Sequence, residues 1–105
     1  MLFDMRTYNC RPGTAKRHLG LYASEGLEVQ TRHLGQPFFY AITETGQLNS
    51  FVHIWAFSSA ADREQRRSAL QADPLWQAYL DKSAAAGFIL SQENRLLTPA
   101  AFFRS

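Results

Sequence analysis

Residues 50–57 read Ser-Phe-Val-His-Ile-Trp-Ala-Phe, and this stretch decides the fold. Side chains of a β-strand alternate between its two faces. One face therefore carries the small residues Val52, Ile54 and Ala56, which suit packing under a helix. The other face carries large aromatic residues around His53. We expect this second face to be the wall of a pocket or the inside of a subunit interface.

The composition is that of one globular domain spanning 1–105. A chain of 105 residues can bury a hydrophobic core without a disulfide or a metal. The net charge of +2 and the lack of basic runs argue against nucleic-acid binding. A single cysteine, Cys10, fits a reducing compartment. We see neither a leader pattern nor an apolar run near the roughly 20 residues of a membrane span, so we expect a cytoplasmic protein without membrane contact.

Hydrophobic periodicity and turn residues divide the chain into strands and helices. We expect a strand over 2–10, a helix from 15 to about 34, strands over 37–45 and 50–57, a helix over 59–72, a second helix from 74 to 86, and a last strand over 88–97. Gly26 is expected to kink the first helix. Asp73 is a good N-cap, and Gly87 can end the last helix in the left-handed conformation.

This β-α-β-β-α-β order predicts an α+β, ferredoxin-like fold with a four-stranded antiparallel sheet and its helices on one face. The predicted strand order is 4-1-3-2. On the uncovered face we expect Arg6 and Tyr8 of the first strand beside His53 and Trp55 of the third. A monomer exposing such rings would aggregate, so we expect a homodimer that packs two of these faces together.

Eight short motifs resemble a NIPSNAP domain in their order and spacing, over nearly the whole chain. They are Arg6-Thr7-Tyr8, Arg11-Pro12-Gly13, Arg32-His33-Leu34-Gly35, Gly46-Gln47-Leu48-Asn49, His53-Ile54-Trp55, Asp62-Arg63-Glu64-Gln65-Arg66-Arg67, Asp73-Pro74-Leu75-Trp76 and Ser91-Gln92-Glu93-Asn94. NIPSNAP domains are similar to the dimeric α/β-barrel superfamily, so the resemblance implies that two ferredoxin-like sheets close into one barrel. That superfamily includes cofactor-free monooxygenases, haem-degrading enzymes and lactone isomerases, and membership does not specify a reaction.

His53 and Arg6 are the candidate catalytic residues. A histidine that titrates near neutrality can act as a general base, and an arginine can stabilise the resulting oxyanion or hold a carboxylate. Both residues also have a structural interpretation. His53 would then bond to Tyr8 or to a backbone carbonyl, and Arg6 would stack on Trp55 or pair with Glu93.

Six further residues are predicted to bind a ligand in or near the barrel lumen. They are Tyr8, Phe51, Trp55, Asn49, Arg32 and His33. Arg32 and His33 either complement the helix dipole at the end of the first helix or gate the mouth of the barrel. Asn49 is either a turn residue or a ligand contact at the rim. Arg63, Arg66 and Arg67 form either a solvated helix face or a site for phosphate or an acidic partner.

The sequence predicts neither a metal nor a cofactor. The three histidines fall on separate elements, and we find no glycine-rich phosphate loop or dinucleotide fingerprint. Three hypotheses remain for the function. The favoured one is binding of a small, partly apolar molecule in the barrel lumen, because no second acid or base can be placed beside His53. The others are a cofactor-independent monooxygenase or isomerase with a histidine base, and a structural dimer that acts through its surface.

Overall fold

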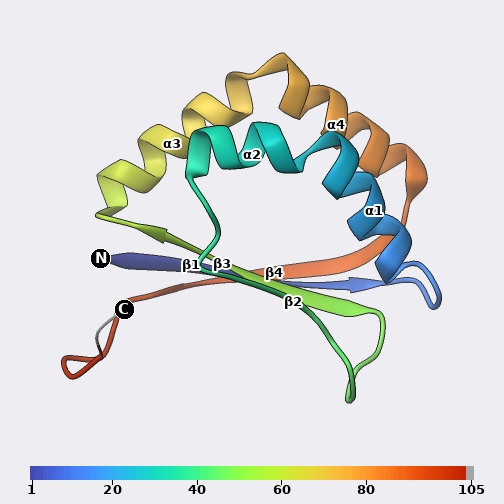
Figure 1. The fold of residues 1–105 in the computed structure, drawn as a ribbon, viewed down its shortest axis with the longest axis horizontal. Helices are drawn as coiled ribbons and strands as arrows, with labels where there is room; N and C mark the ends of the chain where they lie inside the picture. Colours follow the sequence, from blue (N-terminus) through green and yellow to red (C-terminus); the bar gives the residue numbers. More distant parts are fainter. Residues whose placement is uncertain (104–105) are drawn as a thin grey trace.

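The computed structural model describes residues 1–103, which form one sheet covered by one layer of helices (Figure 1). In chain order the elements are β1 (Leu2–Cys10), α1 (Ala15–Glu25), α2 (Leu27–Leu34), β2 (Phe39–Ile42), β3 (Ser50–Phe57), α3 (Ala60–Ala72), α4 (Pro74–Ala86) and β4 (Ile89–Leu97). This is the predicted β-α-β-β-α-β order, with each helical region divided into two helices. Among residues 1–103, no helix is both long and apolar enough to cross a bilayer.

The strands form one antiparallel sheet in the order β2-β3-β1-β4. This order confirms the predicted ferredoxin-like fold, in which the first and third strands are central. The register places Arg6 opposite His53 and Tyr8 opposite Phe51. These side chains therefore share one face of the sheet, as the sequence predicts. The second strand, Phe39–Ile42, is shorter than the expected 37–45.

One bulge interrupts the pairing of β1 with β4. Asn9 pairs with Ser91, but Cys10 pairs with Ile89, which leaves Leu90 as an extra residue. Ile89 consequently lies on the same side of the sheet as Cys10 and packs against the buried cluster there. Leu90 is 64% exposed.

Three residues set the ends of the helices. Gly26 separates α1 from α2, and a Cβ at this position would lie 3.0 Å from the ring of Tyr22 and 3.1 Å from the ring of Tyr79. The side chain of Asp73 caps α4 by accepting a backbone hydrogen bond, as predicted. Gly87 ends the same helix with a φ of 65°, where a glycine is favoured.

The helices cover the aromatic face of β3, and this corrects the predicted orientation of the sheet. Phe51, Trp55 and Phe57 are each 2% exposed, and His53 is 4% exposed. Residues from all four helices join the main core cluster with this strand: Tyr22, Val29, Leu34, Leu70, Trp76 and Tyr79. Large rings bury more apolar area than small aliphatic residues, so placing them under the helices stabilises the single chain more. The prediction that this face is a subunit interface is therefore wrong.

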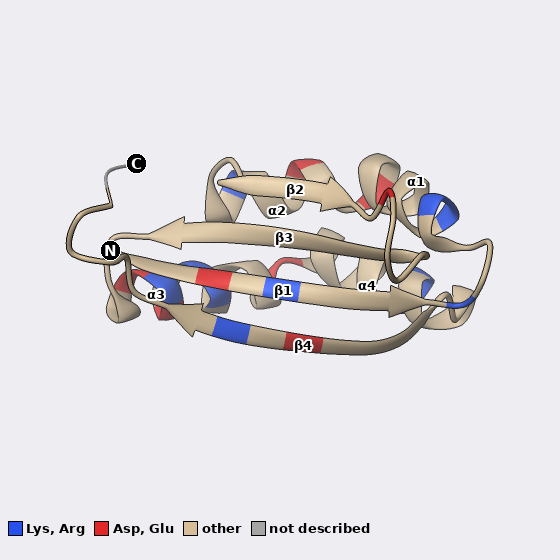
Figure 2. Cartoon of the chain, turned by 90° about the horizontal axis from the view of Figure 1, so that it is seen from below, with Lys and Arg blue, Asp and Glu red and all other residues tan. Residues whose placement is uncertain are grey.

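The uncovered face of the sheet carries the smaller residues of β3 instead. Figure 2 shows the strands from this side, with the helices behind them. Val52, Ile54 and Ala56 are half-buried here. Phe3 points to the same face but is buried, because Phe38 packs on it with ring centroids 5.1 Å apart and Phe103 with centroids 6.4 Å apart. The remaining face is apolar at its centre.

Candidate functional site

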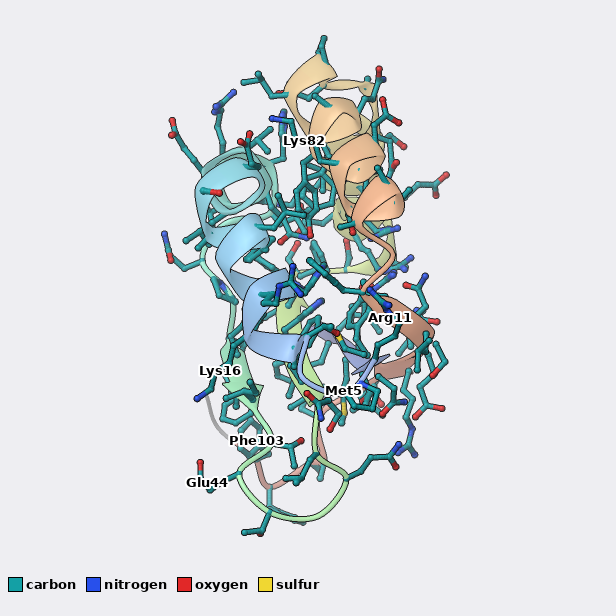
Figure 3. All side chains as sticks on the ribbon, turned by 90° about the vertical axis from the view of Figure 1, so that its right-hand side faces the viewer. Met5, Arg11, Lys16, Glu44, Lys82 and Phe103 are labelled. Atoms are coloured by element: carbon teal, nitrogen blue, oxygen red, sulfur yellow. The ribbon has the colours of Figure 1, made fainter. Side chains whose placement is uncertain are left out.

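A cavity of about 350 Å³ lies between the covered face of the sheet and helices α1, α2 and α4. Figure 3 looks at the end of the molecule formed by α1 and α4, where side chains fill the space between helices and strands. Lys82 of α4 lies in the helix layer, with its Nζ 3.1 Å from Oε1 of Glu25 in α1. Leu80 and Gln92 line the cavity and are exposed, so the cavity reaches solvent.

Aromatic rings form most of the inner wall of the cavity. Six aromatic side chains line it: Tyr8, Tyr22, Tyr40, Phe51, Trp76 and Tyr79. The rings of Tyr8 and Phe51 stack with centroids 4.8 Å apart, and those of Tyr40 and Phe51 are nearly parallel at 6.2 Å. Strands supply one side of this wall and helices the other. Tyr22 of α1 stacks on Tyr40 of β2 with ring centroids 5.5 Å apart, so the two layers also touch each other. An apolar molecule in the cavity would meet aromatic side chains from both layers.

His53 lies in the centre of this wall. Its ring centroid is 4.8 Å from that of Tyr40 and 5.3 Å from that of Tyr8. Nδ1 of His53 accepts a hydrogen bond of 2.7 Å from the indole N–H of Trp55. In the neutral imidazole the proton must then be on Nε2, for which residues 1–103 offer no acceptor. His53 therefore presents an N–H donor rather than a basic lone pair.

Burial and the nearby charge of Arg6 lower the pKa of His53 to about 4. The imidazole is consequently neutral at physiological pH. A general base works best when its pKa lies near the working pH, so this shift makes His53 a weak base. Geometry and electrostatics both favour a role as a hydrogen-bond donor over the predicted role as a base.

Within residues 1–103, the cavity wall contains two histidines and no other acidic or basic side chain apart from its tyrosines. Burial lowers the pKa of His18 and raises the pKa of Tyr22 and Tyr40 well above the usual 10. It also raises the pKa of Tyr79 to about 12. Among the described residues, the lining includes no aspartate, glutamate, lysine or arginine. Such a wall disfavours an ionic ligand, because a charge would lose its hydration without gaining a partner.

Two buried nitrogen atoms of the cavity wall have no hydrogen-bond partner within residues 1–103. They are Nε1 of Trp76 and Nδ1 of His18. Buried polar groups are normally satisfied by protein, water or ligand. An indole nitrogen can only donate, so Trp76 keeps an N–H donor that no residue of 1–103 uses. The other nitrogen of His18 lies 3.4 Å from the hydroxyl of Tyr79.

The structure brings three predicted site residues together at the cavity: Tyr8, Phe51 and His53. Trp55 lies behind them and acts through its hydrogen bond to the imidazole. Arg6 is next to His53 in the sheet but does not line the cavity. It pairs with Asp4, with Nε 3.2 Å from Oδ1, rather than with Trp55 or Glu93.

The other three predicted residues lie away from the cavity. Oδ1 of Asn49 accepts a hydrogen bond of 2.9 Å from the backbone N–H of Gly13, which braces two loops. Arg32 and His33, in the last turn of α2, both approach the carboxylate of Asp73, at 3.5 and 2.8 Å. This contact ties the end of α2 to the start of α4. It gives both residues a structural role.

Sequence reasoning missed His18, Tyr22 and Tyr40 as parts of the wall. It also did not identify Trp76 and Tyr79 of α4 as wall residues. A signal for the first two exists, because His18 and Tyr22 are four residues apart and share a face of α1. A polar residue on the buried stripe of a helix is the pattern that could have found them. Within the described part of the chain, no group of three His, Cys, Asp or Glu side chains could hold a metal ion.

Comparisons with known proteins converge on one family. A family model described as NIPSNAP matches residues 3–104. A solved NIPSNAP family protein from Agrobacterium tumefaciens is 41% identical, with a TM-score of 0.89 over 98% of this chain and 91% of that one. A solved NIPSNAP domain protein from Burkholderia xenovorans is 34% identical, with a TM-score of 0.92 over 100% of both chains.

More distant relatives give information on the shared fold and on how much of a longer protein this chain matches. An antibiotic biosynthesis monooxygenase is 16% identical, with a TM-score of 0.63 over 95% of this chain and 99% of that one, which shows a common fold alone. A NipSnap homologue of Dictyostelium discoideum is 27% identical over 93% of this chain. The match covers 42% of that protein, and 18% of a NipSnap protein of Caenorhabditis elegans. The chain thus spans less than half the length of these curated relatives.

Proposed function

Because this chain belongs to the NIPSNAP family, we propose that it binds a small, uncharged, aromatic molecule in the cavity between its sheet and its helices. The observation that carries this proposal is the indole N–H of Trp76, which has no partner within residues 1–103 and belongs to a wall rich in aromatic rings. The binding site lies within one chain. This location differs from the one expected from the sequence, which was the barrel lumen between the sheets of two chains.

The chemistry of the wall defines the class of ligand. The aromatic side chains favour an aromatic body, and the N–H donors of Trp76 and His53 favour a carbonyl or ether oxygen on it. Carboxylate and ammonium groups are disfavoured by the lack of a charged lining residue. The proposed ligand is therefore an aromatic ketone, quinone or lactone rather than an acid or an amine.

Calorimetric titration with anthrone, a neutral aromatic ketone, tests this proposal. We expect saturable binding at one site per chain. Trp76→Phe replaces the indole by a smaller aromatic ring without an N–H, so it should weaken binding by about tenfold. Leu75→Met, at an exposed neighbouring position of α4, is the control and should bind as the wild type does. No saturable heat with anthrone, or equal affinity in Trp76→Phe, would contradict the proposal.

The second candidate function is catalysis without a cofactor on the same class of molecule. The fold that this chain shares with an antibiotic biosynthesis monooxygenase is compatible with catalysis. A shared fold does not by itself identify a reaction. In this candidate the Nε2–H of His53 stabilises a developing oxyanion, with Arg6 acting from behind the wall. Turnover of anthrones, quinols and lactones by wild type and by His53→Ala tests it. Equal turnover in both proteins, or none in either, would count against catalysis.

The third hypothesis is a structural dimer. We propose that the chain forms a homodimer through the uncovered face of its sheet. Met5, Val52, Ile54 and Ala41 supply an apolar centre on that face, which a second copy could cover. Ile54→Glu should convert a dimer into a monomer in sedimentation experiments. A monomeric wild type at micromolar concentration would refute the proposal. We also propose a cytoplasmic location, because the chain has a single cysteine, Cys10, which is buried.

A further inference from the structure

Two arginines bind one buried carboxylate between β1 and α3, and a third arginine is close enough to feel its charge. Asp4 is 1% exposed and accepts hydrogen bonds from Arg6 at 3.2 and 3.3 Å and from Nε of Arg63 at 3.0 Å. Arg67 lies one helical turn after Arg63 on the same face of α3. Of the two alternatives for the arginines of α3, the solvated helix face does not hold for Arg63, which binds Asp4. This cluster contains more positive than negative charge.

Arg67 carries the unbalanced charge of this cluster. It is half-buried and makes no hydrogen bond or ion pair with any residue of the described chain. Burial, followed by the like charges of Arg6 and Arg63, lowers the pKa of Arg67. A guanidinium remains protonated under such conditions, so the charge stays in place. An unpaired, partly desolvated cation is unfavourable unless something outside the chain pairs with it.

An open groove runs along this face of α3. Arg63, Glu64, Arg67, Ser68 and Gln71 line it. The arginines, the Ser68 hydroxyl and the Gln71 amide can donate hydrogen bonds into the groove. Glu64 is the one acidic lining residue. It is exposed and makes no ion pair with the arginines, as far as residues 1–103 show.

We propose that this groove is an anion-binding site that takes the carboxylate or phosphate group of a small molecule, with Arg67 as its main contact. The planar guanidinium can bind two oxygens of such a group through parallel hydrogen bonds. Arg63 remains bound to Asp4 and adds positive potential from one helical turn away. The site is separate from the aromatic cavity, whose lining shares no residue with the groove.

Titration of ¹⁵N-labelled protein with inorganic phosphate, at constant ionic strength, tests the site. We expect saturable shifts confined to residues 63–71 of α3. Succinate in a parallel titration shows whether a carboxylate serves equally well. Arg67→Gln should weaken binding by about tenfold or more, because it removes a charge-assisted contact. Arg66→Gln removes the same charge from an exposed position of the same helix and should bind as the wild type does.

Thermal unfolding separates a binding role from a structural one. Phosphate should raise the Tm of the wild type and of Arg66→Gln but not that of Arg67→Gln. Without phosphate, Arg67→Gln should be at least as stable as the wild type, because it relieves repulsion. Anthrone binding in the cavity should be unchanged in this variant, so the two proposals fail independently. Lack of saturable shifts with both anions, or equal losses in Arg66→Gln and Arg67→Gln, would overturn the inference.

Discussion

The indole N–H of Trp55 donates a hydrogen bond of 2.7 Å to Nδ1 of His53, two residues earlier on the same face of β3. This bond makes the two side chains one unit. Trp55 lies in the core cluster, whereas His53 lines the cavity. The core therefore sets the tautomer that the cavity presents.

The first prediction concerns that tautomer. ¹⁵N spectra of the imidazole should show a neutral ring protonated at Nε2 at pH 7. Trp55→Phe removes the donor, so the spectra should shift toward a mixture of both tautomers, and the pKa of His53 should rise because its neutral form loses a hydrogen bond. A wild-type ring protonated at Nδ1 would contradict the assignment.

The second prediction is a loss of stability in acid. The folded pKa of His53 is about 4, below the ordinary 6.5. Between these values the unfolded chain binds a proton that the folded chain does not. The free energy of unfolding should therefore be largest above pH 6.5 and should fall by roughly 3 kcal/mol from this residue as pH drops to 4.

His53→Gln isolates this contribution, since glutamine does not titrate. Urea unfolding at pH 7 and pH 4.5 should show a smaller loss of stability in the variant than in the wild type, by roughly 2 kcal/mol. The variant should still lose some stability, because His18 is also buried with a lowered pKa. Identical losses in both proteins would show that His53 titrates normally in the fold.

The third prediction concerns the buried carboxylate under α3. Asp4→Asn keeps the shape of the side chain but leaves Arg6 and Arg63 without a counter-charge. Removing one partner of a buried ion pair costs about 3–5 kcal/mol, which urea unfolding measures directly. Asp81→Asn, at an exposed position of α4, is the matched control and should leave the unfolding midpoint unchanged. Equal midpoints for both variants would argue against the buried pair.

The fourth prediction compares two glycines of the first helical region. Gly20 lies in α1 with nothing near its missing Cβ, so Gly20→Ala should stabilise the protein by about 0.5–1 kcal/mol. Gly26→Ala places a methyl 3.0–3.1 Å from the rings of Tyr22 and Tyr79. Overpacking of this kind costs about 1–3 kcal/mol. Both rings line the cavity, so Gly26→Ala should also weaken anthrone binding. Similar stability of the two variants would show that the rings move freely.

Most of the fold could be predicted from local signals in the sequence. Turn and cap residues such as Asp73 and Gly87 fixed the ends of elements, and the alternation in 50–57 defined a strand with two distinct faces. The pairing of Arg6 with His53 followed from the topology. The covered face could not be chosen in this way, since both faces of β3 are apolar and alternation does not say which one meets the helices.

The candidate site could be predicted only in part, for a related reason. Strand alternation identifies Tyr8, Phe51 and His53 as neighbours, and the structure places all three at the cavity. The opposite wall is formed by helices. An aromatic residue on the buried side of a helix, such as Trp76, looks the same in the sequence whether it fills a core or lines a cavity. Arg67 could not be singled out from the sequence either. Only the fold brings it near Asp4 and the two arginines that bind Asp4.

The extra residue at Leu90 has a consequence for comparing this chain with others. Without Leu90, Asn9 would still pair with Ser91 and Cys10 with Ile89, in a ladder without a bulge. The side chains before and after the bulge would therefore stay on the faces of the sheet that they occupy now. A one-residue difference in length can therefore be absorbed here without disturbing the wall of the cavity. When sequences of unequal length are aligned over this region, the gap belongs at Leu90.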